Sequence, residues 1–392
     1  MFVFQNKLWK DFKKCLVIQG ENSFLFDTRK KYFRKGNPFE TIEKFVEEEK
    51  GIKFGYISYN LSRFAESLKI QGEDDIGIPD CVLVSLDQKK YENISIPKGS
   101  YKISIPNINT GKEQFISGVI EAKRHIYNGD IYQVNLSRRI EIECQINAYS
   151  LFSNYIRAQP IRFPAFLEFP DLGFSIGSGS MEIFLEKKDS RIRECPIKGT
   201  RKIQEKDPEV IKKISDELLN DEKEIAENLM IVDMVRNDLG KVCKIGTVRP
   251  RRLFDVEKYE TLIHLVSEVE GELEKNKKIS DILIATFPAA SITGAPKKSA
   301  MEIIEKIEKK RRGPYCGAIS MFDESGDFIM LVSIRIFLYL HRGKLYYWTG
   351  CGIVWDSDPY KEWEETLTKT KAFINALQNQ VLPEEKTESH TL

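Results

Sequence analysis

The chain has 392 residues, of which 41% are hydrophobic and 30% charged, the ordinary balance of a globular protein with one large domain or two smaller ones. Sixty Lys and Arg residues against 59 Asp and Glu leave a formal net charge of +1, without the basic excess typical of nucleic-acid or anionic-membrane binding. We therefore expect neither as a partner, and the basic run 309–312, which acids flank, is interpreted as a solvated helix end.

The cysteines and the apolar runs indicate the compartment. Seven cysteines are widely spread and form no C-x-x-C pair, which argues against a disulfide framework or a zinc site. Residues 1–7 lack the basic and apolar segments of a signal peptide. No apolar run approaches the roughly 20 residues of a membrane span. We expect a cytoplasmic protein.

Residues 1–105 predict a strand-rich N-terminal region. Apolar runs at 16–18 and 81–84 are bounded by polar or turn residues, as in short strands, and 41–49 has a helical pattern. Pro, Gly, Asn and Lys then accumulate at 97–111, which predicts a linker.

The pattern of residues 112–378 predicts a second, larger region, and the polar residues 383–392 predict a disordered tail. An amphipathic helix is expected at 114–128, because it ends at an Asn-Gly pair that is typical of helix C-termini. Helices and strands alternate too irregularly for a barrel, and no G-x-G-x-x-G or Walker loop is present, so the pattern is α+β. We expect further helices within 207–237 (two), 296–312 and 359–378, and strands at 132–142, 318–322, 328–338 and 345–348.

Two pairs of glutamates have helical spacing. Glu224 and Glu227 are three residues apart, and Glu362, Glu365 and Lys369 fall at i, i+3 and i+7. Carboxylates from two helices that face one cleft make an oxygen site suited to Mg²⁺. The plainer interpretation is a pair of solvated helix faces.

Two turns could hold an anionic ligand. Thr293-Gly294-Ala295-Pro296 precedes a predicted helix, where free backbone N–H groups bind anions. Gly350 and Gly352 follow a predicted strand and let bare backbone approach a ligand. Ordinary turn chemistry is the alternative for both.

Three further residues are ambiguous. His264 lies in an apolar run, as a buried structural histidine would. Arg335 lies within an apolar strand pattern and needs a carboxylate partner, from a ligand or from the protein. Lys198 is interpreted as an ordinary loop lysine, unless its surroundings make the amine available as a nucleophile.

Taken together, these segments resemble the chorismate-utilising enzymes, the group that holds the large subunits of anthranilate synthase and aminodeoxychorismate synthase. The similarity covers about residues 114–377, and the N-terminal part matches more loosely. Nine motifs follow in family order: GDIYQVNLSRR (129–139), ECPIKGTR (194–201), ENLMIVDMVRNDLG (227–240), HLVSEVEGEL (264–273), FPAASITGAPKKSAMEII (287–304), YCGAI (315–319), SIRIF (333–337), GCGIVWDSDP (350–359) and EWEETLTK (362–369).

The resemblance implies an α+β fold of two packed β-sheets flanked by helices, with the active site in the cleft between them. The residues at two positions distinguish the reactions that members of the family catalyse. Members that add water have a lysine base where this chain has Gln133, whose neutral amide cannot deprotonate water, which indicates ammonia. Aminodeoxychorismate synthases read P-I-K-G-T around Lys198, whereas anthranilate synthases, the alternative, read P-I-A-G-T.

The resemblance also implies site roles. Glu227 and Glu365, with Glu224 and Glu362 nearby, would hold Mg²⁺. Glu182 would be the general acid and Lys198 the nucleophile at C2 of chorismate, although Met181 replaces the proline that usually precedes the acid. Residues expected to contact the substrate or its ring are His264, Arg335, Thr293, Gly350, Gly352, Lys369, Gln133, Gly199 and Thr200.

The product implied is 4-amino-4-deoxychorismate, a precursor of 4-aminobenzoate and folate, formed by a transaminase-type transferase. The sequence contains no glutaminase signature. Ammonia is therefore expected from a separate glutamine amidotransferase subunit in a heterodimer, or from free ammonium.

Overall fold

The computed structural model describes residues 1–27, 30–68, 72–94, 111–159, 161–203, 207–259 and 262–378. The predicted linker, apart from Gly111, and the predicted tail lie outside these residues. No helix in the described ranges is long and apolar enough to cross a membrane.

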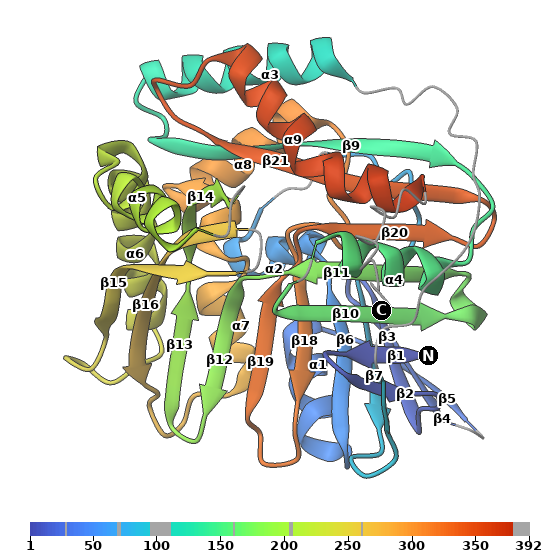
Figure 1. Ribbon diagram of the computed structural model, residues 1–392. Helices are drawn as coiled ribbons and strands as arrows, with labels where there is room; N and C mark the ends of the chain where they lie inside the picture. The colour runs from blue at the N-terminus through green and yellow to red at the C-terminus, as the bar shows by residue number, and fades with distance from the viewer. Residues whose placement is uncertain are drawn as a thin grey trace, which may run out of the picture.

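Two antiparallel sheets hold the strands of the described residues, and helices cover them, so the α+β prediction is confirmed (Figure 1). The first sheet has the strand order β17-β9-β21-β20-β11-β10-β1-β2-β8, and the second has β14-β16-β13-β12-β19-β18-β6-β7-β3-β4-β5, with β15 also paired to β16. The first sheet comprises β1 (Phe2–Phe4), β2 (Lys7–Trp9), β8 (Glu92–Asn93), β9 (Gln133–Glu143), β10 (Phe163–Phe169), β11 (Phe174–Ser180), β17 (Gly294–Ala295), β20 (Ile336–Leu340) and β21 (Lys344–Ile353).

The second sheet comprises β3 (Lys14–Gln19), β4 (Asn22–Asp27), β5 (Lys31–Lys35), β6 (Ile52–Ile57), β7 (Cys81–Leu86), β12 (Ile183–Lys188), β13 (Arg191–Cys195), β14 (Ile197–Lys202), β15 (Arg249–Lys258), β16 (Leu262–Glu272), β18 (Ala318–Phe322) and β19 (Phe328–Val332). The helices are α1 (Pro38–Glu48), α2 (Arg63–Glu66), α3 (Lys112–Tyr127), α4 (Ala148–Ala158), α5 (Pro208–Leu219), α6 (Glu222–Gly240), α7 (Ile279–Thr286), α8 (Lys297–Glu308) and α9 (Pro359–Leu377).

The N-terminal region contributes strands to both sheets. In the first sheet β1 pairs with β10, and in the second β6 pairs with β18. The two regions of the sequence, 1–105 and 112–378, therefore share their sheets and the core between them.

Three helices begin at an Asx-Pro pair, which the sequence shows directly. Asn37, Asp207 and Asp358 are N-caps whose side chains accept backbone N–H bonds of the first turn, and each is followed by proline. Proline suits this position because its fixed φ is helical and it lacks an N–H that would be unsatisfied there.

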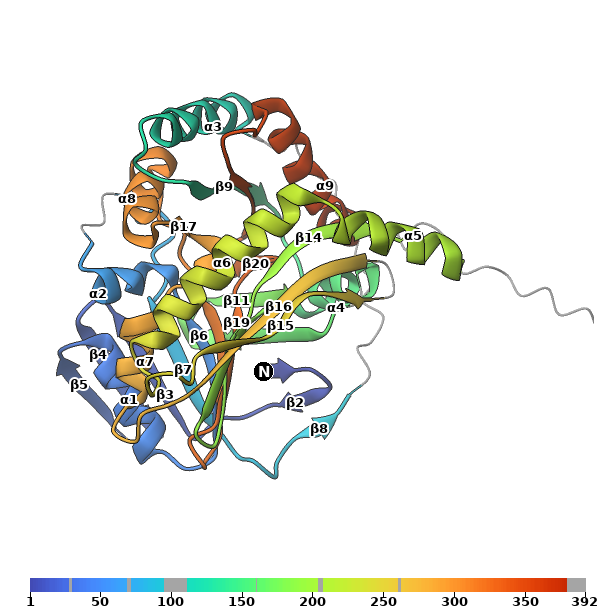
Figure 2. The same ribbon diagram turned by 90° about the vertical axis from the view of Figure 1, so that its left-hand side faces the viewer.

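The main core lies between the two sheets. It joins apolar side chains of the first sheet, such as Ile176 and Leu338, to those of the second, such as Val84 and Leu331. Separate apolar clusters fix α4 and α9 on the first sheet, and α3 and α8 against β9. Figure 2 shows α6 running alongside β14, β15 and β16 of the second sheet.

The single strand predicted at 328–338 is wrong. The chain leaves the second sheet after β19, turns at 333–335 and enters the first sheet as β20. Arg335 takes a left-handed backbone conformation there, with φ of 53°. A second crossing, at Met181 and Glu182, connects β11 to β12. The two crossings lie side by side, because Val332 N donates to Glu182 O at 3.0 Å and Gly179 N donates to Arg335 O at 2.9 Å.

Candidate active site

A cavity of about 1180 Å³ lies where the two crossings meet. Both sheets contribute to its walls, as do α4, α6 and α9. Of the residues expected at the site, it is lined by Glu182, Lys198, Gly199, Thr200, Glu224, Glu227, His264, Arg335, Gly350, Gly352, Glu362, Glu365 and Lys369.

Glu182 is buried at its sheet crossing, with 5% of its surface exposed. Burial raises the pKa of its carboxyl from 4.5 to about 7, although the Ser291 hydroxyl and the Lys198 ammonium act in the opposite direction. A carboxyl with this pKa can hold a proton near neutral pH and release it, which is what a general acid requires.

Arg335 faces the cavity from the other crossing. One of its guanidinium nitrogens, Nη1, donates to the backbone oxygen of Lys369 at 2.9 Å, and no carboxylate of the described residues pairs with it. This bond anchors one side of the guanidinium fork to α9 and leaves other N–H groups for a ligand. A planar fork of this kind suits a carboxylate.

His264 is a neutral imidazole on β16. Burial and the nearby Arg335 lower its pKa to about 4. Its Nδ1 lies 2.8 Å from the Thr200 hydroxyl, whereas Nε2 is buried without a hydrogen-bond partner among the described residues. A ligand group in the cavity can supply that partner.

Lys198 lies on β14 between the acid and the glutamates. Its ammonium acts on Glu182, Glu227 and Glu365, and in each case it lowers the carboxyl pKa against the effect of burial. A Cβ added at Gly352 would lie 3.4 Å from Lys198 Nζ. Lys198 Nζ therefore lies close to the backbone of β21 at Gly352.

The four glutamates come from α6 and α9, as their spacing predicts. Glu224 pairs with Arg201 at 3.1 Å and Glu365 with Lys369 at 2.6 Å. Burial raises the pKa of Glu227, and Glu224 and Glu362 raise it further. Burial likewise raises the pKa of Glu362, with Glu365 adding to the effect. The carboxylates thus repel one another across the two helices.

This donor set fits a divalent cation. The ligand atoms of Cys351, Glu362 and Glu365 lie within 4.8 Å of one another, and Glu227 faces Glu362 from α6. A cation between them would relieve the repulsion that raises the pKa of Glu227 and Glu362. Carboxylate oxygens are the ligands that Mg²⁺ prefers, although Lys369 would have to release Glu365.

Two of the expected residues do not line the cavity. Thr293 is fully buried, and its hydroxyl donates to the backbone oxygens of Ala289 and Ala290. Gln133 is 1% exposed and lies beside Gly352, where an added Cβ would be 2.6 Å from Gln133 Nε2 and 3.4 Å from Lys198 Nζ. The glycines Gly350 and Gly352 lie inside β21 rather than after a strand.

Sequence reasoning missed the aromatic wall of the cavity. Tyr315 and Trp348 both line it, with ring centroids 6.1 Å apart and nearly parallel planes. Trp348, Gly350 and Gly352 alternate along β21, so a longer strand prediction would have placed them on one face. No local sequence pattern predicts that Tyr315 lines the cavity, since it reaches the wall from the segment before β18.

Comparison with known proteins defines the class. The chain belongs to the chorismate binding enzyme family, which it matches over residues 3–375. It is 32% identical over 403 residues to anthranilate synthase component 1 of Acetivibrio thermocellus, covering 88% of this chain and 81% of that protein. It is 33% identical over 404 residues to aminodeoxychorismate synthase component 1 of Bacillus subtilis (strain 168), covering 91% and 84%.

The fold is shared with a solved structure. Anthranilate synthase component I from Streptococcus pneumoniae TIGR4 superposes with a TM-score of 0.82 at 24% identity, over 94% of this chain and 92% of that one. The match includes the two sheets, so the fold expected from the family resemblance is confirmed.

Proposed function

We propose that this protein is the chorismate-aminating component of an aminodeoxychorismate synthase, which replaces the C4 hydroxyl of chorismate with an amine. The observation that carries the proposal is the position of Lys198. Its amine lies between the buried acid Glu182 and the glutamates of α6 and α9, where a nucleophile toward the ring would be needed.

The walls suit the two carboxylates of chorismate. Arg335 would hold the enolpyruvyl carboxylate, together with backbone N–H groups near Gly350 and Gly352. Glu227, Glu362 and Glu365, with Glu224 beside them, would hold Mg²⁺, which when bound would draw charge from the ring carboxylate. Lys369, Gly199 and Thr200 supply further polar contacts around the substrate.

The covalent route balances without another reactant. The Lys198 ammonium first gives a proton to the Glu182 carboxylate. The resulting amine adds to C2 of the ring, the double bonds shift, and the C4 hydroxyl leaves as water with the proton of Glu182. Ammonia then adds at C4, the double bonds shift back, the lysine amine leaves from C2, and the proton released by the new amine returns to Lys198. The net change is chorismate plus ammonia to 4-amino-4-deoxychorismate plus water.

Ammonia rather than water as the nucleophile is supported by Gln133. An amide cannot act as a base toward water, and this one is buried beside Gly352, on the side where Lys198 lies. We propose that a glutamine amidotransferase subunit supplies the ammonia, since the relatives are named as component 1 of their synthases.

Anthranilate synthase component 1 is the second candidate. The relative from Acetivibrio thermocellus carries that name and is as similar to this chain as the aminodeoxychorismate synthase relative is. The two candidates differ in where the amine is added and in whether pyruvate is lost.

A product assay separates them. The purified chain would be incubated with chorismate, Mg²⁺ and ammonium, and the products analysed by mass and fluorescence. We expect an amine that retains its pyruvyl group and yields 4-aminobenzoate when a lyase is added. Fluorescent anthranilate would instead establish the second candidate, and unchanged chorismate would contradict both.

A further inference from the structure

The active-site cavity has two ends that differ in charge. The inner end carries both signs, since the glutamates and the buried acid Glu182 lie there together with Lys198, Arg335 and Lys369. The outer end lies between α4, β14 and the second half of α9, and its walls carry Arg157, Lys202 and Lys371 beside the amides Gln159 and Asn375. Lys202, Lys371 and Asn375 are exposed to solvent, so this end forms a mouth.

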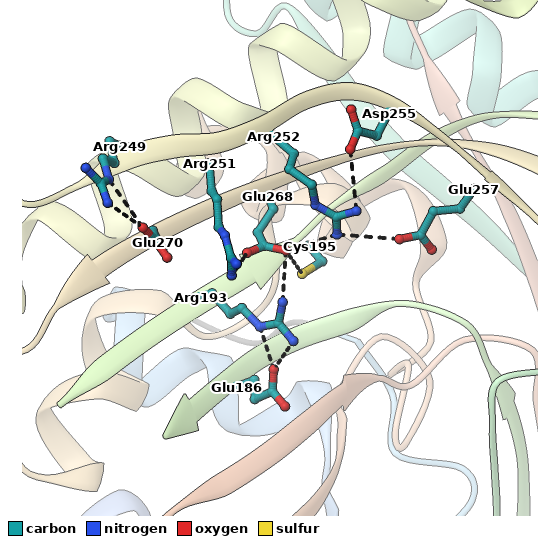
Figure 3. A network of polar contacts seen from close by, with 10 residues as sticks. All are labelled: Glu186, Arg193, Cys195, Arg249, Arg251, Arg252, Asp255, Glu257, Glu268 and Glu270. Carbon is teal, nitrogen blue, oxygen red and sulfur yellow. Dashed lines mark hydrogen bonds and ion pairs between the residues drawn. The ribbon is translucent and has the colours of Figure 1, made fainter. Parts of the chain in front are cut away.

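The three cations of the mouth have no carboxylate partner among the described residues, whereas many cations elsewhere in the chain form ion pairs. On the second sheet, for example, Glu268 alone takes contacts from Arg193, Arg251 and Arg252 (Figure 3). Arg157, by contrast, donates only to Asn154 and the Ser153 backbone, and neither Lys202 nor Lys371 forms an ion pair within the described part of the chain.

The size of the cavity leaves room for this mouth to act separately. The cavity volume of about 1180 Å³ exceeds the roughly 300–1,000 Å³ of pockets that enclose drug-sized ligands. Chorismate is smaller than such ligands. Arg335 and the glutamate helices suffice for the two ends of the substrate. Arg157, Lys202 and Lys371 therefore remain unused by the proposed reaction.

We propose that Arg157, Lys202 and Lys371 form an anion-capture site, where a dicarboxylate substrate is held before it moves inward to the reacting groups. The proposal rests on the proposed function, since chorismate is such a dianion. The inner end carries carboxylates as well as cations, whereas the mouth carries cations and no acid among its lining residues, so the mouth is the part of the cavity that favours an incoming dianion. Clefts lined by one sign of charge raise association rates by about 10- to 1,000-fold.

Charge reversal at the mouth tests the proposal through rates of binding. The double variant Lys202→Glu/Lys371→Glu would be compared with wild type by stopped flow, using Trp348 fluorescence and chorismate. We expect an association rate constant at least about tenfold lower at low salt, with an unchanged dissociation rate constant. Between about 0.01 and 1 M salt the Debye length falls from about 30 to 3 Å, so the difference should vanish.

Lys44→Glu/Lys89→Glu is the matched control. Both lysines are exposed, lie outside the cavity and form no ion pair in the ranges that the structure describes, so net charge changes equally. An equal fall of the association rate constant in the control, or a change confined to the dissociation rate constant, would overturn the capture site. In that case chorismate binding and turnover by wild type would still support the proposed function. Absence of chorismate binding by wild type would overturn both.

Discussion

Lys198 and Glu182 are a basic and an acidic side chain that lie close together in the cavity wall. The protonation of Glu182 therefore depends on the neighbouring ammonium and on burial. Glu182 keeps a raised pKa of about 7 because burial outweighs the nearby ammonium. Both residues therefore serve the proposed reaction through their surroundings, and each can be tested by a substitution that changes one property.

Substitution of Lys198 tests the covalent route. We expect Lys198→Ala and Lys198→Arg to lower amination of chorismate more than about a hundredfold, because neither has the amine that adds to C2. Calorimetry should show that Mg²⁺-dependent chorismate binding persists. Lys198→Arg keeps the positive charge, so near-normal activity in that variant would mean that the charge, and not the nucleophile, matters.

Glu182→Gln tests the buried acid through stability and rate together. The pKa of Glu182 is about 7 in the folded protein, against 4.5 in the unfolded chain. Between pH 4.5 and 7 the folded state therefore binds a proton that the unfolded state has lost, and the free energy of unfolding falls as the pH rises through this range. At about 1.36 kcal/mol per pH unit, we expect the glutamine variant to be about 3 kcal/mol more stable than wild type at pH 8. Amination should fall about 10²- to 10⁴-fold.

Urea unfolding of both proteins from pH 4 to pH 8 measures the difference in stability. The free energies of unfolding of the two proteins should converge near pH 4, where neither the carboxyl of Glu182 nor the amide that replaces it is charged. A difference that does not change with pH would show that Glu182 is not held protonated by burial.

At the scale of elements, α9 presents one face to the cavity and another to solvent. Glu362, Glu365 and Lys369 line the cavity, whereas Glu364 is exposed and does not. The Asp358 cap and Pro359 set where the helix begins, and hence which residues of its first turns reach inward.

Substitution of Glu365 and of its neighbour compares the two faces of α9. We expect Glu365→Gln to weaken Mg²⁺ binding at least about tenfold, and Glu364→Gln to leave it unchanged. Titration calorimetry with Mg²⁺ in the presence of chorismate measures both affinities. Equal affinities in the two variants would remove Glu365 from the metal site.

The whole molecule depends on sheets that both parts of the sequence share. Removal of residues 1–94 would uncover the edge of β10 and the edge of β18, along with the core between the sheets. Unpaired strand edges and exposed apolar surface favour aggregation.

Cleavage between the two parts tests this dependence. A protease site placed within 95–110 should leave the cut fragments associated and folded, whereas the fragment 111–392 expressed alone should be insoluble or unfolded. Size-exclusion chromatography and circular dichroism measure the two states. A folded, monomeric fragment 111–392 that still binds chorismate would show that the N-terminal strands are dispensable.

Local signals in the sequence were sufficient for α1, α3, α5, α6, α8 and α9 and for the glutamate pairs, because helical spacing acts over a few residues, whereas α4 and α7 were not predicted. The ordered motifs also indicated the family and its fold, which the comparisons confirm. The roles of Lys198 and Glu182 remain proposals that those motifs suggested.

Only the tertiary structure decided where the chain changes sheets. The run Phe328–Leu338 is apolar apart from Ser333 and Arg335, and no glycine or proline marks the crossing at Arg335, which adopts a left-handed conformation. Likewise, the backbone uses the Thr293 hydroxyl, and Arg157 of α4, Lys202 of β14 and Lys371 of α9 line one cavity. Such juxtapositions arise from packing between segments far apart in sequence, which no local periodicity encodes.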